Sequence, residues 1–192
     1  MDGPRKQSPL NIANILTFVR IILIPCFLTA VAYRNFRYAF YIFVAAAITD
    51  KLDGIAARMT GKGVDIGTFL DPLADKIMLS SSFIIFLIMH LAPVWLAILV
   101  LSRDIIVVMG LAVLSISGKK PIISPSWAGK LAIAAQFTFI AIVLARLNFS
   151  VVPPVLETAL AWAVAVLTAI SGLQYMERGL RLAHGRSTWS RD

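Results

Sequence analysis

Long apolar stretches separated by short polar segments run along almost the whole chain. Stretches of about 20 residues are long enough to cross a hydrocarbon core of about 30 Å as α-helices. We place six such spans, over residues 12–33, 38–59, 67–91, 93–117, 127–147 and 153–176. The pattern predicts an all-α, polytopic membrane protein with a single domain over residues 1–192 and short tails at about 1–10 and 178–192.

Composition and charge support a membrane protein. The chain is 59% hydrophobic and 15% charged, whereas soluble domains are roughly 45–50% apolar and about 25% charged. The net charge of +8 is spread between the apolar stretches, which favours contact with a membrane surface over binding of nucleic acid. Cys26 is the single cysteine; it excludes an internal disulfide and a cysteine-based zinc site, and we expect it to serve packing.

Basic residues predict the orientation of the spans. Only Arg34, Arg37 and Arg146 fall on one side, and many more fall on the other: Arg5, Lys6, Arg58, Lys62, Lys119, Lys120, Lys130, Arg178, Arg181, Arg186 and Arg191. Because basic residues concentrate in cytoplasmic segments, both termini are predicted to be cytoplasmic.

Four carboxylates lie at the edges of two predicted spans, where charge is normally avoided. Asp50 and Asp53 are three residues apart, and Asp71 and Asp75 are four apart, so each pair shares one face of a helix. At a rise of about 1.5 Å per residue, the first pair lies roughly 18 to 23 Å from the outer end of its span and the second roughly 6 to 12 Å from the cytoplasmic end. The two pairs are thus predicted at similar depth, as a functional site.

A divalent metal explains such a cluster. Four close carboxylates repel one another and take up protons unless cations hold them ionised. Oxygen ligands without a nearby His or Cys favour Mg²⁺ or Mn²⁺. Gly54 suits close approach of a ligand or a neighbouring helix, and Arg58, one turn further on, suits a phosphate group.

The same residues resemble the signature of a known family. They read Asp-x-x-Asp-Gly-x-x-Ala-Arg from Asp50 to Arg58, followed after eight residues by Gly67 and then by Asp71 and Asp75. This spacing is that of the CDP-alcohol phosphatidyltransferase family. The first span, NIANILTFVRIILIP, resembles the start of its phosphatidylglycerophosphate synthase and CMP-forming cardiolipin synthase branch, so the resemblance covers nearly the whole chain.

The resemblance implies transfer of a phosphatidyl group from CDP-diacylglycerol to an alcohol, with release of CMP. Asp50, Asp53 and Asp71 would bind two Mg²⁺ or Mn²⁺ ions, and Asp75 would be both a ligand and the general base. The residues implied to border the CDP moiety are Asp53, Gly54, Ala57, Arg58 and Gly67. The resemblance also implies a homodimer in a bacterial-type inner membrane, with the active site open to the cytoplasm.

Other polar residues leave alternatives open. Arg103 lies near the middle of the fourth span and either contacts the acceptor or pairs with the aspartate cluster. Asp104 points about 100° away along the helix, so we expect the two residues to have separate partners. Lys130 is either a topology anchor or an acceptor contact. Three residues on one face of the first span serve either interhelical hydrogen bonds or nucleotide contact: Asn14, Thr17 and Arg20.

The acceptor is predicted to be phosphatidylglycerol, with glycerol-3-phosphate as the alternative. Phosphatidylglycerophosphate synthases usually carry another basic residue two positions after the lysine equivalent to Lys130, where this chain has Ala132. No cation follows Arg103 in its span, and the Pro-Ser-x-x-Gly-Lys segment ending at Lys130 resembles CMP-forming cardiolipin synthases. A cation-coupled transporter is a more remote alternative, because inverted repeats and discontinuous helices are not evident in the sequence.

Overall fold

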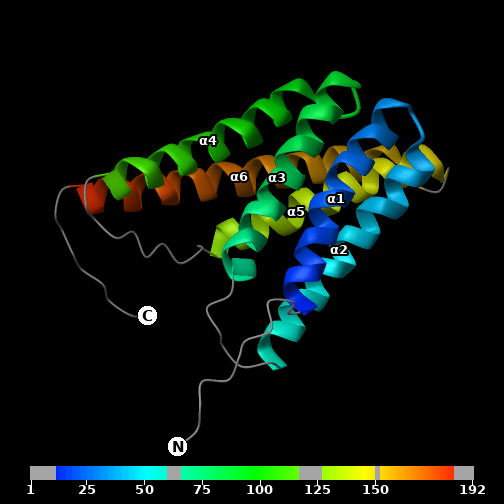
Figure 1. Ribbon diagram of the computed structural model, residues 1–192. Helices are drawn as coiled ribbons and strands as arrows, with labels where there is room; N and C mark the ends of the chain where they lie inside the picture. Colours follow the sequence, from blue (N-terminus) through cyan, green and yellow to red (C-terminus); the bar gives the residue numbers. More distant parts are fainter. Residues whose placement is uncertain (1–11, 60–65, 117–126, 150–151, 184–192) are drawn as a thin grey trace, which may run out of the picture. The chain divides into compact units, whose positions relative to one another are not determined.

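Six α-helices make up the part of the chain that the structure describes. The computed structural model describes residues 12–59, 66–116, 127–149 and 152–183, without the side chains of 12–18, 50–59, 66–75, 111–116 and 180–183. These residues form no strand; their helices are α1 (Ile12–Ala32), α2 (Phe36–Met59), α3 (Ile66–Ile88), α4 (Val94–Ile116), α5 (Trp127–Asn148) and α6 (Pro154–Ala183) (Figure 1). Five predicted spans coincide with helices to within a few residues, and the sixth helix continues to Ala183, past the span end predicted at residue 176 and into the predicted tail. The helices confirm the all-α class.

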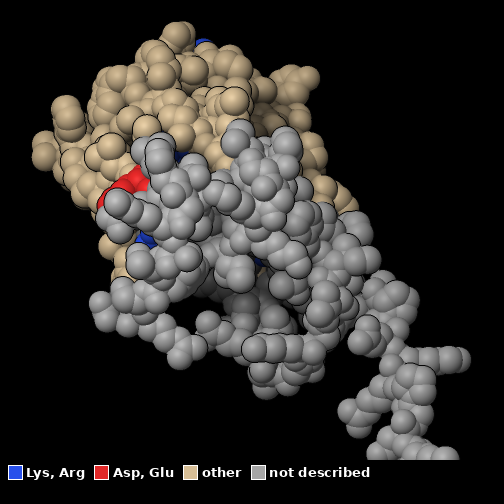
Figure 2. Space-filling view, turned by 90° about the vertical axis from the view of Figure 1, so that its left-hand side faces the viewer, with Lys and Arg blue, Asp and Glu red and all other residues tan. Residues whose placement is uncertain are grey.

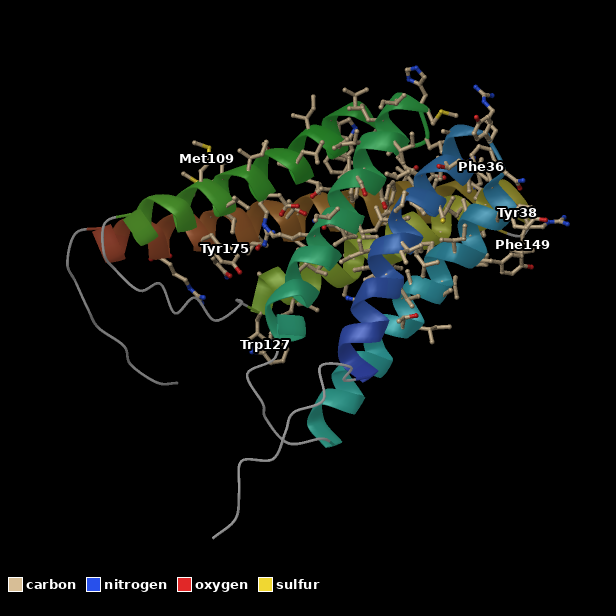
Figure 3. The ribbon with its side chains drawn as sticks, in the orientation of Figure 1. Phe36, Tyr38, Met109, Trp127, Phe149 and Tyr175 are labelled. Carbon is tan, nitrogen blue, oxygen red and sulfur yellow. The ribbon has the colours of Figure 1, made fainter. Side chains whose placement is uncertain are left out.

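The exposed surface fits a membrane protein. Among the described residues, Trp127–Asn148 and Pro154–Gly179 are long and apolar enough to cross a membrane. The face in Figure 2 carries only small patches of acidic and basic side chains on its described part. Tyr38 and Trp127 are 64% and 83% exposed near helix starts (Figure 3), as is usual at membrane interfaces. Six spans, the orientation of the termini and a single domain remain predictions.

The chain divides into two compact units, Met1–Ser81 and Ser82–Asp192. In the first unit α1 packs beside α2 (Figure 1). The buried residues of α1 recur at helical spacing and form one face, which consists of Arg20, Ile24, Phe27 and Val31. Phe27 meets Phe43 of α2 with ring centroids 5.7 Å apart. Cys26 lies off this face and is exposed, so it does not have the packing role expected for it among the described residues.

Both α1 and α3 end in the same kind of turn. Arg34 has a φ of 58° and His90 a φ of 55°, the left-handed conformation of a Schellman cap. The N–H of Asn35 donates to the carbonyl of Ala30 at 2.8 Å, and that of Arg34 donates to Val31 at 2.9 Å. The turn after Arg34 is short, so α2 runs back along α1.

In the second unit, α6 packs against both α4 and α5. Small or short side chains of α6 are buried at helical spacing: Ala161, Val164, Ala165, Thr168 and Ser171. Such residues let neighbouring helices approach closely. The Nε2 of Gln136 on α5 donates to the Oγ1 of Thr168 at 3.2 Å in the buried contact, and Phe83 of α3 stacks on Phe139 of α5 at 6.1 Å.

Prolines and one ion pair define the helix ends of this unit. Pro93 immediately precedes α4, and Pro154 begins α6, which are positions where a missing N–H is harmless. Arg146 in the last turn of α5 forms an ion pair with Glu157 in the first turn of α6. The ion pair thus links the end of α5 to the start of α6.

Candidate functional site

The predicted metal-binding aspartates lie on two helices of the first unit. Asp50 and Asp53 are in the second half of α2, and Asp71 and Asp75 are in the first half of α3. Because both segments are helical, each pair lies on one face of its helix. The predicted CDP-contacting residues are on the same two helices: Gly54, Ala57, Arg58 and Gly67.

The donor set of these helices fits a hard divalent cation. It consists of carboxylates alone, presented in pairs by two helices. The side chains of the four aspartates lie outside the described side chains, and no group of three metal-binding residues occurs among those that are described. Coordination by the aspartates therefore remains a prediction.

Arg20 adds a buried cation to the first unit. Its side chain is 1% exposed on the face of α1 that packs on α2. Arg20 lies about 18 Å from the end of α1, and Asp50 lies about 21 Å from the start of α2. Because the two helices are antiparallel and joined by a short turn, Arg20 lies close to the level of Asp50.

Arg103 is the central residue of a second polar cluster, where α4 packs on α6. Its side chain is 6% exposed. The Nη1 atom donates to the Oδ1 of Asp104 at 2.8 Å, and Nη2 donates to the buried Oγ of Ser171 on α6 at 2.7 Å. The guanidinium carbon lies 5.2 Å from the ring centroid of Tyr175, which projects from α6 (Figure 3).

The contact between Arg103 and Asp104 corrects a prediction. We expected adjacent residues to have separate partners because their Cβ atoms point about 100° apart. The long arginine side chain lets its terminal nitrogen reach the neighbouring carboxylate. An arginine within an apolar helix gains from such a partner because an unpaired charge is costly there.

Sequence reasoning missed Ser171 and Tyr175. They lie four residues apart on α6 and therefore on one face, which the structure turns toward Arg103. Two polar positions at helical spacing in an apolar helix are a usable signal for such a face. Lys130 is exposed in the first turn of α5, a position compatible with both of its predicted roles.

A family model described as CDP-alcohol phosphatidyltransferase matches residues 10–170. The chain belongs to the CDP-alcohol phosphatidyltransferase family. It is therefore an enzyme of lipid-headgroup transfer, as the aspartate spacing predicted, and the transporter alternative is set aside.

Curated relatives carry more specific names. A protein of Mycobacterium tuberculosis named probable phosphatidylglycerophosphate synthase is 36% identical over 89% of this chain and 82% of its own length. CDP-diacylglycerol–glycerol-3-phosphate 3-phosphatidyltransferase of Salmonella choleraesuis is 36% identical over 86% of this chain and 93% of its own length. The enzyme of the same name from Bacillus subtilis is 32% identical over 88% and 94%. These names fit glycerol-3-phosphate as the acceptor, the alternative in the sequence analysis, better than the predicted phosphatidylglycerol.

Proposed function

We propose that this CDP-alcohol phosphatidyltransferase transfers the phosphatidyl group of CDP-diacylglycerol to glycerol-3-phosphate, forming phosphatidylglycerophosphate and CMP. The similarity to relatives named for that reaction, at 32% or 36% identity over most of both chains, carries the proposal. It replaces phosphatidylglycerol, the acceptor that the sequence favoured.

The aspartates supply the ion-binding groups of the proposed site. Asp50, Asp53 and Asp71, together with Asp75, would hold two Mg²⁺ or Mn²⁺ ions, in keeping with their all-oxygen chemistry. When bound, these ions neutralise the diphosphate and stabilise the attacking and leaving oxygens. Gly54, a residue without a side chain, gives the CDP moiety room beside α2.

The chain's own residues then move one proton and orient two substrates. The acceptor hydroxyl oxygen forms a bond to the phosphatidyl phosphorus as the bond from that phosphorus to the CMP oxygen breaks. Asp75 accepts the hydroxyl proton, and CMP leaves with the bonding electron pair. Ala57, Arg58 and Gly67 border the CDP moiety, while Arg103 binds the phosphate of the acceptor, for which guanidinium donors are well suited.

The proposed setting is a bacterial-type inner membrane, with the site open to the cytoplasm and the enzyme a homodimer. Arg58 lies near the predicted cytoplasmic surface, where soluble glycerol-3-phosphate and CMP exchange freely. Lys130 follows the segment 117–126, which carries Lys119 and Lys120 and is also predicted to be cytoplasmic. We propose Lys130 as a further contact for the acceptor.

One assay separates the two acceptors. Full-length protein, purified in detergent with Mg²⁺ and CDP-diacylglycerol, receives glycerol-3-phosphate, phosphatidylglycerol, inositol phosphate or serine in separate reactions. We expect CMP release and phosphatidylglycerophosphate with glycerol-3-phosphate, and no turnover with excess EDTA. Cardiolipin formed from phosphatidylglycerol, with no product from glycerol-3-phosphate, would overturn the proposal.

Phosphatidylglycerol remains a second candidate because of one position. Ala132 stands two positions after Lys130, where it offers no second cation to the phosphate of an acceptor near Lys130. An acceptor without a phosphomonoester needs fewer cations. Cardiolipin formation at a higher kcat/KM than phosphatidylglycerophosphate formation would favour this candidate.

A further inference from the structure

The guanidinium of Arg103 is held from three directions. Asp104 accepts from Nη1 and Ser171 accepts from Nη2, while the ring of Tyr175 covers the guanidinium at 5.2 Å. Two of these three groups come from α6. The bonds at both terminal nitrogens fix the plane of the guanidinium, and the ring limits its tilt.

One donor of this otherwise restrained group has no described partner. The Nε–H of Arg103 is buried and makes no hydrogen bond within the described part of the protein. An arginine serving only to link α4 and α6 would be expected to satisfy all its buried donors, because an unmade bond to a charged group costs more than about 1 to 3 kcal/mol. Nε–H and Nη2 share one edge of the guanidinium, the edge that binds two oxygens of a phosphate or carboxylate.

We propose that Ser171 and Tyr175 are positioning residues that hold the Nε edge of Arg103 ready for the phosphate of the acceptor. Ser171 keeps Nη2 in place, and the Tyr175 ring prevents the guanidinium from swinging away from α6. This inference rests on the proposed function, in which Arg103 binds glycerol-3-phosphate. It adds two residues of α6 to the acceptor contact proposed for Arg103 on α4.

The test compares two variants that release the guanidinium with two controls. Ser171→Ala removes the acceptor for Nη2, and Tyr175→Leu removes the ring. Thr168→Val is the matched control, because Thr168 is a buried α6 hydroxyl that bonds Gln136 and not Arg103. Tyr175→Phe keeps the ring face and loses only the hydroxyl.

We expect both test variants to raise the KM for glycerol-3-phosphate, Ser171→Ala by about tenfold, the equivalent of one hydrogen bond to a charged group. The kcat and the KM for CDP-diacylglycerol should stay within about twofold of wild type, because the transferring groups are unchanged. Thr168→Val and Tyr175→Phe should keep the wild-type KM for glycerol-3-phosphate. Thermal midpoints of all four proteins are measured beside the kinetics.

Two outcomes would overturn the inference in distinguishable ways. If wild type turns over glycerol-3-phosphate but Ser171→Ala and Tyr175→Leu change only the thermal midpoint, or change KM no more than Thr168→Val does, the residues are merely structural. If wild type releases no CMP with glycerol-3-phosphate, the proposed function fails, and the positioning role for that phosphate fails with it.

Discussion

At the residue scale, Arg20 is a buried cation on α1, the helix that packs beside the α2 helix of Asp50 and Asp53. A fully buried arginine in an apolar helix is costly and needs nearby negative charge. Arg20 lies near the level of Asp50 on the neighbouring helix and has a 1% exposed side chain. This position is compatible with both roles that the sequence left open for Arg20, interhelical hydrogen bonding and nucleotide contact.

We predict that Arg20→Met lowers kcat/KM for CDP-diacylglycerol at least about tenfold, because the cation that balances the site is lost. Arg20→Lys should fall between this variant and wild type, since lysine keeps the charge without the planar donor array. Ile22→Met is the control: Ile22 is 63% exposed on another face of α1. Wild-type kinetics in Arg20→Met would assign Arg20 to interhelical hydrogen bonding alone.

The proposed general base gives a second residue-scale prediction. Asp75→Asn should fold and still bind CDP-diacylglycerol, yet lose at least about 100-fold in kcat, because an amide does not accept a proton at neutral pH. Binding is measured by the shift of the thermal midpoint on adding CDP-diacylglycerol. Near-normal turnover in this variant would show that another group accepts the proton.

At the element scale, two helices end on residues that are not glycine. His90 adopts a φ of 55°, and the N–H of Leu91 reaches back to the carbonyl of Phe86 at 2.8 Å to close the α3 turn. The left-handed conformation costs a residue with a Cβ roughly 1 to 2 kcal/mol. Glycine avoids that cost, but ordering its more flexible backbone lowers the stability of the folded protein by about 0.5 to 1 kcal/mol relative to alanine.

We therefore predict that His90→Gly raises the free energy of unfolding by about 0.5 kcal/mol, the small difference between these two effects. His90→Ala should not stabilise the protein, because alanine keeps the Cβ. The thermal midpoints of the two variants in detergent test this order. A lower midpoint for His90→Gly than for His90→Ala would contradict the turn geometry.

Helices were predictable from sequence, whereas their side-chain contacts were not. Apolar runs were enough to locate α1 to α6 within a few residues, except for the end of α6, which continues to Ala183. The turn residues Arg34 and His90 carry no glycine signal. Helical spacing gives the direction of a Cβ atom but not the reach of a long side chain, so the Arg103–Asp104 ion pair was predicted wrongly.

The family was predictable from sequence, whereas the residues of the candidate site stay a prediction. The spacing from Asp50 to Asp75 was sufficient to predict the family, because it matches the family's signature. The acceptor was not predictable in this way. It depends on which cations from separate helices meet in space, and Arg103 is oriented by Ser171 and Tyr175, about 70 residues further along the chain.

At the scale of the whole molecule, charge asymmetry predicts which side the site opens to. Of the cations on the predicted outer side, Arg34 closes the turn between α1 and α2, and Arg146 pairs with Glu157. The segments predicted to be cytoplasmic carry most of the Lys and Arg residues. An outer side with so little basic charge favours cytoplasmic termini.

Cysteine labelling in bacterial spheroplasts tests this orientation, and the single native cysteine makes the background simple. In a Cys26→Ala protein, Asn35→Cys introduces a thiol in the exposed α1–α2 turn and Ser187→Cys introduces one in the C-terminal tail. A membrane-impermeant maleimide should label Asn35→Cys in intact spheroplasts and Ser187→Cys only after lysis, because the positive-inside rule puts the two sites on opposite sides. Both proteins should react fully in detergent and release CMP at the rate of the Cys26→Ala parent, which controls for thiol access and folding. Labelling of Ser187→Cys in intact spheroplasts would reverse the orientation and turn the aspartate pairs away from the cytoplasm, where CMP and glycerol-3-phosphate must exchange.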